Sequence, residues 1–204
     1  MKICSYNLYG VVNTPEGIPE FQTRLNLLKH KITILMEMTD IFFFQEVNEH
    51  NMDMINKLFR DKPFFIYGKR YPMTTDENTL QYNLIVIKDW LLPYLINVTC
   101  LPHGNDVKYM PPEKQIRDYG MSDYRTSLFL HLKINEKTYV LGNTHTDYIS
   151  IDGKINGVCK SLSYLETYRY DYALLLGDMN MVPHMAECYT ILREKKQLDY
   201  CVKK

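Results

Sequence analysis

Polar residues able to do chemistry lie where four apolar segments end. Asn7 closes the first segment, Glu46 the second, His145 a later one, and Asp178 and Asn180 follow the last. In open α/β sheets, binding and catalytic sites form where strands end. One carboxylate after an apolar strand is common, but this combination on four strands is not. The sequence therefore predicts that these residues meet in one site.

These residue types form a coherent set for phosphate chemistry. Glu46 offers a hard oxygen ligand and Asn7 a neutral oxygen beside it, which suits Mg²⁺. His145 could move a proton or donate to a phosphoryl oxygen near neutral pH. Asp178 could orient or deprotonate a water molecule, with Asn180 donating to the phosphate. Together they favour metal-assisted hydrolysis of a phosphate ester.

Each residue also has a structural explanation when it is taken alone. Asn7 and the Gly177–Asp178 pair could be turn residues, Glu46 could begin a helix cap, and His145 could be a satisfied buried histidine. The functional hypothesis depends on their joint occurrence and their order.

Alternating strand and helix patterns must position these residues. Apolar stripes or mixed periodicity predict helices over 21–38, 48–59, 153–168 and 183–196. Apolar runs predict strands over 2–8, 40–46, 64–67, 82–88, 94–100, 125–134, 138–145 and 172–178, with a hairpin turn at 135–137. The fold class is therefore α/β, with mixed sheets sandwiched by helices, and we expect a single domain over 1–204.

Composition excludes several classes of protein. The 204 residues are 46% hydrophobic and 24% charged, as in globular proteins rather than disordered or collagen-like chains. Lys plus Arg and Asp plus Glu are both 24, and this zero formal charge argues against coating long nucleic acid by bulk charge. The five cysteines form no C-x-x-C pair, and neither a signal peptide nor a membrane segment is visible. We therefore expect reduced thiols, no membrane insertion, and an intracellular location, cytoplasmic or nuclear.

Four motifs, in this order, resemble those of the endonuclease/exonuclease/phosphatase superfamily, which includes exonuclease III and deoxyribonuclease I. They are Ser5-Tyr6-Asn7, Phe44-Gln45-Glu46-Val47, Asn143-Thr144-His145 and Gly177-Asp178-Met179-Asn180. The resemblance spans residues 2 to about 185. It implies a four-layer α/β sandwich of two packed mixed sheets flanked by helices, and hydrolysis of phosphoesters with Mg²⁺ or Mn²⁺.

The resemblance also implies a role for each matching residue. Glu46 would be the main metal ligand, with Asn7 near the metal or the phosphate. His145 would be catalytic and contact the scissile phosphate, and Asp178 would orient the attacking water with help from Asn180, itself also near the substrate. A further residue, Arg125, matches a position where relatives often carry arginine, and would contact the phosphate.

One departure from the family pattern affects activity. Relatives carry a Ser-Asp-His motif after two further strands, but here only a helix is expected between Asp178 and Lys204, so the fold is expected to be C-terminally shortened. Ser122-Asp123-Tyr124 comes too early in the chain to replace that motif, and we do not expect His103 or His184 to replace its histidine. Three explanations stay open: a shortened active enzyme, a shortened binding protein, or a fragment.

The preferred function is a divalent-metal-dependent nuclease or nucleic-acid phosphodiesterase, acting on a nucleic acid or nucleotide. Neutral charge favours a short, single-stranded or small substrate. One alternative is a non-catalytic binding protein, whose long loop over 102–123 and neighbouring residues offer Tyr109, Tyr119 and Tyr124 for stacking. The other is a phosphatase or a lipid-directed phosphodiesterase. The segment 90–95 is the one candidate for docking on lipid, and it fits a strand entrance better.

Overall fold

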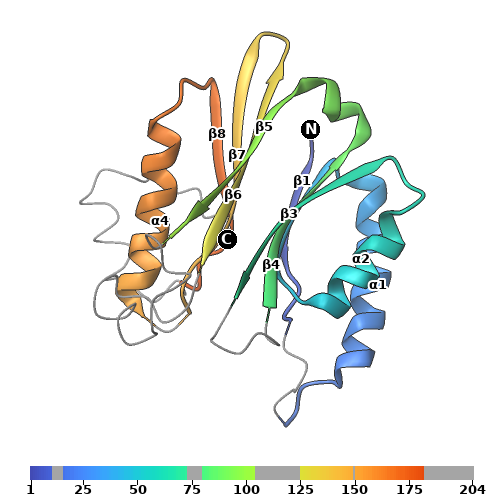
Figure 1. The fold of residues 1–204 in the computed structure, drawn as a ribbon. Helices are drawn as coiled ribbons and strands as arrows, with labels where there is room; N and C mark the ends of the chain where they lie inside the picture. Colours follow the sequence, from blue (N-terminus) through green and yellow to red (C-terminus); the bar gives the residue numbers. More distant parts are fainter. Residues whose placement is uncertain (11–15, 73–79, 104–124, 149, 182–204) are drawn as a thin grey trace.

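The protein forms two β-sheets packed face to face, with helices on both outer faces (Figure 1). This description comes from a computed structural model and covers residues 1–10, 16–72, 80–103, 125–148 and 150–181. The four layers are helices, sheet, sheet and helix, which is the α/β sandwich that the resemblance implied. Asn7, Glu46, His145 and Asp178 lie at one end of this sandwich.

The first sheet has the strand order β1-β2-β4-β3. Its strands are β1 (Ile3–Asn7), β2 (Ile41–Val47), β3 (Phe64–Pro72) and β4 (Leu80–Lys88). Strand β1 runs parallel to β2, while β4 is antiparallel to both β2 and β3. Helices α1 (Phe21–Met38) and α2 (Glu49–Phe59) cover the outer face. Strand β2 is buried on both faces, as its continuous apolar run predicts.

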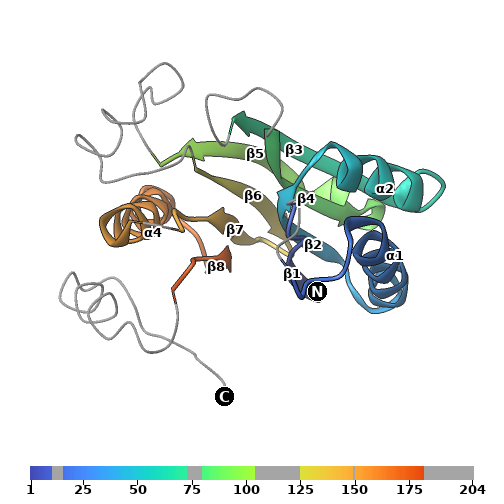
Figure 2. The ribbon, with the colours of Figure 1, turned by 90° about the horizontal axis from the view of Figure 1, so that it is seen from below.

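The second sheet has the strand order β5-β6-β7-β8. Its strands are β5 (Leu95–Pro102), β6 (Thr126–Ile134), β7 (Lys137–His145) and β8 (Tyr172–Asp178). Strands β5, β6 and β7 are antiparallel in turn, whereas β8 runs parallel to β7. Helix α4 (Ile151–Glu166) is the crossover between β7 and β8 and covers the outer face (Figure 2).

Apolar side chains fill each interface between layers. The core between the two sheets includes Ile41, Phe43, Ile85, Leu128 and Leu130, which are all almost fully buried. Alternate residues of β2, Phe42 and Phe44, face the helices instead. Burial on both faces makes the central strands rigid supports for the residues at their ends.

Most expected elements are found, with differences at their ends. Helix α1 and strand β8 have the predicted bounds, while β3 extends to Pro72 rather than ending at 67. The segment 90–95, interpreted as a strand entrance, does lead into β5 at Leu95, and Asp89–Tyr94 within it forms the 3-10 helix η2 with Leu91 buried. The predicted helix 183–196 and most of the loop over 102–123, including Tyr109 and Tyr119, lie outside the described residues, as does Tyr124.

The turn between β6 and β7 is a two-residue hairpin at Asn135 and Glu136. Both residues have positive φ, 50° and 63°, which is the signature of a type I′ turn. The predicted hairpin is thus confirmed.

Among the described helices, none combines the length and the apolar character needed to cross a membrane.

Candidate functional site

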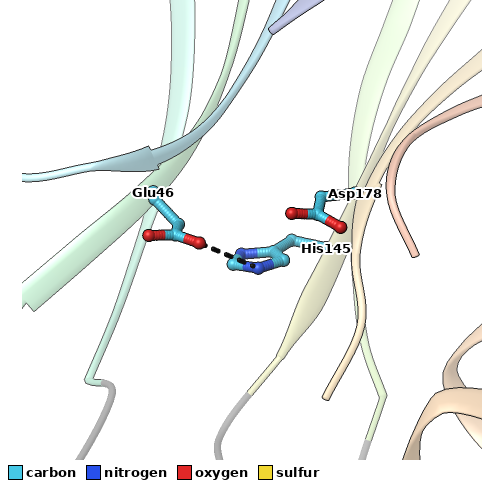
Figure 3. A group of neighbouring side chains, drawn as sticks. All are labelled: Glu46, His145 and Asp178. Carbon is cyan, nitrogen blue, oxygen red and sulfur yellow. Dashed lines mark ion pairs between the residues drawn. The ribbon is translucent and has the colours of Figure 1, made fainter. Parts of the chain in front are cut away.

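The predicted site residues come together at one end of the sandwich. Asn7 ends β1, His145 ends β7 and Asp178 ends β8, while Glu46 is the last residue but one of β2. Strand β1 runs parallel to β2, and β7 runs parallel to β8, so the two strands of each pair end on the same side of their sheet. In the pairing of β7 with β8, His145 lies directly opposite Asp178. Figure 3 shows Glu46 of one sheet pointing toward His145 and Asp178 of the other.

Asn7 links the carboxylates of the two sheets. Its Nδ2 donates to Oε1 of Glu46 at 2.8 Å and to Oδ2 of Asp178 at 2.6 Å. Its Oδ1 accepts from the backbone N–H of Tyr9 at 2.8 Å. In this arrangement the amide nitrogen faces the carboxylates, so the expected role of Asn7 as an oxygen ligand would require its amide to turn over.

A β-bulge aims Glu46 into the site. Between Phe44 and Val47 the register of β2 against β4 shifts, so that two residues of β2 oppose the single residue Asn83. Glu46 adopts φ of 53°, a left-handed conformation that is uncommon for residues other than glycine. Bulges of this kind redirect a side chain next to active sites. Sequence patterns predicted the strand but not the bulge.

A buried amide pair behind the cluster joins the two sheets. Gln45 Nε2 donates to Asn143 Oδ1 at 2.6 Å, and Asn143 Nδ2 donates to the backbone oxygens of Phe44 at 3.0 Å and Leu84 at 2.8 Å. Both amides are essentially inaccessible to solvent. The sequence contained the signal, since polar residues next to Glu46 and His145 interrupt apolar strands, but not the pairing.

A tight turn after β8 holds Asp178. The backbone N–H of Asn180 donates to Asp178 Oδ1 at 2.8 Å, and Asn180 Nδ2 donates to the backbone oxygen of Thr146 at 2.9 Å. Asn180 itself is left-handed, with φ of 51°. One carboxylate oxygen of Asp178 therefore accepts a hydrogen bond from the backbone of this turn, and the other accepts one from Asn7. These two bonds fix the orientation of the carboxylate.

Arg125 lies directly beside His145. Its Nη1 is 2.9 Å from His145 Nδ1 and 3.3 Å from Nε2, and both side chains are buried. Burial, then the Arg125 charge, then His103 hold the pKa of His145 well below its usual range. The imidazole is therefore neutral at pH 7. Its 3.6 Å approach to Glu46 Oε1 is then too long for a hydrogen bond and is not an ion pair.

His103 lies outside this group of residues, in a buried polar chain. Its Nε2 is 2.8 Å from Ser127 Oγ, and that hydroxyl also contacts the hydroxyls of Thr144 and Ser161 at 2.7 and 2.8 Å. Burial, with Arg125 and Lys160 adding to it, lowers the pKa of His103 to about 3. His184, the other histidine weighed as a replacement, lies outside the described residues.

The neutral state of His103 predicts a measurable loss of stability in acid. Because its folded pKa lies below its unfolded value, the unfolded chain binds a proton first, and stability falls as pH drops below about 6.5. His103→Gln keeps a polar atom near Ser127 but cannot titrate. Between pH 7.5 and 5, we expect wild type to lose about 2 kcal/mol more unfolding free energy than His103→Gln.

Urea denaturation at both pH values, in the presence of EDTA, measures this difference. His131 and His145 also have lowered pKa values, but both remain in the variant, so their effects cancel. Equal acid sensitivity in the two proteins would contradict a neutral buried His103.

The donor set fits a divalent cation. Ligand atoms of Glu46, His145 and Asp178 all lie within 4.8 Å of one another, the one such group found among the described residues. Two carboxylates are the hard oxygen ligands that Mg²⁺ and Mn²⁺ prefer, and the neutral imidazole beside them adds no competing positive charge. The partly exposed carboxylates leave room for water and a substrate oxygen.

Comparison with solved structures identifies the fold. The endonuclease/exonuclease/phosphatase from Bacteroides vulgatus matches with a TM-score of 0.67 and 14% identity, covering 93% of this chain and 69% of its own. A mannosyl-6-phosphatase from Bacteroides thetaiotaomicron matches with a TM-score of 0.67 and 15% identity, covering 95% and 70%. D. rerio TDP2 complexed with single-strand DNA product matches with a TM-score of 0.63 and 12% identity, covering 91% and 63%.

These matches establish that the chain has the fold of the endonuclease/exonuclease/phosphatase superfamily, as the resemblance implied. The chain spans about two thirds of the length of these structures. Searches by sequence found neither a matching family model nor a matching curated protein.

Proposed function

We propose that this protein hydrolyses phosphoesters with Mg²⁺ or Mn²⁺, and that its substrate is a nucleic acid or a nucleotide ester. The observation that carries the proposal is the cluster of Glu46, His145 and Asp178 at the strand ends of both sheets. Two carboxylates and a histidine this close together gather hard ligand atoms and negative charge at one point. A divalent cation with a phosphoryl group would satisfy them.

Glu46 and Asp178 would hold the cation, which when bound polarises a phosphoryl oxygen and lowers the pKa of a bound water. Asp178, held by the backbone N–H of Asn180, would orient the attacking water and take its proton. The water oxygen forms the new bond to phosphorus, the ester P–O bond breaks, and the leaving oxygen takes a proton from solvent.

His145, neutral and held by Arg125, would donate an N–H to a phosphoryl oxygen. Asn7 would complete the metal or phosphate contacts after its amide turns, and Asn180 would donate to the phosphate. Arg125 is buried beside His145. It would therefore contact the same phosphoryl group as the imidazole.

The fold alone does not select the substrate, because it is shared by TDP2 bound to single-strand DNA product and by a mannosyl-6-phosphatase. Zero formal charge favours a short or single-stranded nucleic acid over long duplex DNA. A sugar phosphate is the second candidate.

A substrate panel tests the proposal. Single-stranded DNA, RNA, a 5′-tyrosyl oligonucleotide, an aryl phosphodiester and mannose 6-phosphate would each be incubated with Mg²⁺, Mn²⁺ or EDTA. We expect turnover of a nucleic-acid substrate that EDTA abolishes. Glu46→Gln should lower kcat/KM by about 10³-fold or more, because the members of a catalytic unit act together. Glu37→Gln, the same change at an exposed position of α1, should leave turnover intact.

Metal binding provides a second readout. Mn²⁺ should raise the Tm of wild type and of Glu37→Gln, but not that of Glu46→Gln. Turnover that persists in EDTA would contradict the metal site. Absence of turnover on every substrate would favour the alternative of a non-catalytic binding protein.

A further inference from the structure

One exposed aromatic side chain lies next to the candidate site. Tyr148 follows His145 by three residues and is 53% exposed. The Arg125 guanidinium lies 5.7 Å from the centre of the Tyr148 ring, within the range of a cation–π contact. Because Arg125 also contacts His145, the ring is one side chain away from the cluster.

The backbone on both sides of His145 fixes the position of this ring. The next residue, Thr146, is buried and its N–H donates to the backbone oxygen of Asp178 at 3.0 Å. The residue after it, Asp147, is also buried and accepts the N–H of Ser150 at 3.0 Å. Tyr148 therefore projects from a segment tied to β8 and to the start of α4, and its backbone needs little rearrangement to bind a ligand.

We propose, resting on the proposed function, that Tyr148 stacks on a planar ring of the phosphoester next to the cleaved phosphate. Stacking on an exposed aromatic ring is how proteins hold bases without reading their sequence. Arg125 on one side of the ring adds a favourable cation–π contact. Two sources carry such a ring: a nucleobase of a nucleic acid, and an aryl group esterified to the phosphate. The cluster of Glu46, His145 and Asp178 would bind the phosphate, and Tyr148 would bind the planar ring.

Among the described residues, Tyr9 is a second exposed aromatic side chain close to the cluster. Its N–H donates to Asn7 Oδ1, its φ is 49°, and Arg24 lies 4.9 Å from its ring centre. Tyr9 is less exposed, at 38%, and its ring lies over Arg24 of α1, whereas the Tyr148 ring lies over Arg125, which contacts His145. Tyr148 is therefore the ring we assign.

Steady-state kinetics on three substrates tests the assignment. They are a single-stranded oligonucleotide, the same oligonucleotide with abasic sites, and methyl p-nitrophenyl phosphate. In Tyr148→Leu, we expect the preference for the base-carrying over the abasic substrate, as the ratio of kcat/KM, to fall about 10-fold through KM, a size typical of stacking on one ring. Tyr148→Phe should retain the preference. Tyr170→Leu, at an exposed tyrosine before the far end of β8, should behave as wild type.

The outcomes separate the two sources of the ring and the two proposals. A loss in Tyr148→Leu confined to the aryl diester identifies the ring as an aryl group. If Tyr148→Leu changes neither this preference nor the kcat/KM of the aryl diester, or if the loss is found in Tyr9→Leu instead, the assignment is overturned. If wild type turns over nothing, the proposed hydrolysis fails. Calorimetric titration with the oligonucleotide then decides the assignment alone: binding weakened in Tyr148→Leu but not in Tyr148→Phe supports it, and any other result overturns it.

Discussion

Asp178→Asn is expected to lower kcat/KM by about 10³-fold or more, while the metal-free protein keeps its stability within about 1 kcal/mol. The activity falls because an amide cannot accept the proton of the attacking water and is a poor ligand for a hard cation. Stability is nearly kept because two effects oppose each other. The variant weakens one hydrogen bond, from Asn7 or from Asn180, but it also removes one of two neighbouring carboxylate charges.

Activity, metal-induced Tm shift and unfolding by urea in EDTA, measured together, separate these effects. We expect Mn²⁺ to raise the Tm of wild type and of Asp152→Asn, an exposed carboxylate on α4, but not that of Asp178→Asn. Full activity in Asp178→Asn would remove this residue from the chemistry. A loss of several kcal/mol in EDTA would instead make Asp178 a structural residue whose substitution unfolds the site.

The order of strands and helices, and the four strand ends that carry polar residues, could be predicted from the sequence. Apolar periodicity is a local property, so α1 and β8 emerge with their bounds. The segment 89–94 could not be predicted in this way. Its apolar residues and Pro93 fit an extended segment as well as a short 3-10 helix, and the choice depends on the burial of Leu91 in the core between the sheets.

The geometry of the site depends on long-range contacts that no local pattern encodes. Gln45 and Asn143 are 98 residues apart, yet their hydrogen bond connects the two sheets behind the cluster. The left-handed Glu46 in its bulge is equally invisible in sequence, because nothing in its neighbours requires φ of 53°. Residue type thus predicted which side chains gather at the strand ends, whereas the pairing of the sheets determines where they point.

Gly177→Ala is expected to destabilise the protein by about 4 kcal/mol or more, which is a large part of the stability of an ordinary domain. Gly177 has φ of 135°, a conformation that side chains rarely adopt. A Cβ at this position would lie 1.9 Å from the backbone oxygen of Thr144. That oxygen belongs to β7, which pairs with β8 here, so it cannot retreat without breaking the sheet between His145 and Asp178. Urea denaturation followed by circular dichroism would measure the loss.

Two other glycines separate backbone strain from the clash. Gly17→Ala places a Cβ at φ of 86° with nothing within 4 Å, so it should cost only the strain, about 1 kcal/mol. Gly142→Ala meets side-chain carbons of Leu175 and Phe129 at 2.7 and 2.8 Å, which can shift in part, so its cost should be intermediate. If Gly177→Ala costs no more than Gly17→Ala, the close approach of β8 to β7 is wrong. If its cost matches that of Gly142→Ala, the backbone of β7 yields as readily as a side chain. The expected order therefore tests whether the turn that aims Asp178 is held by backbone packing.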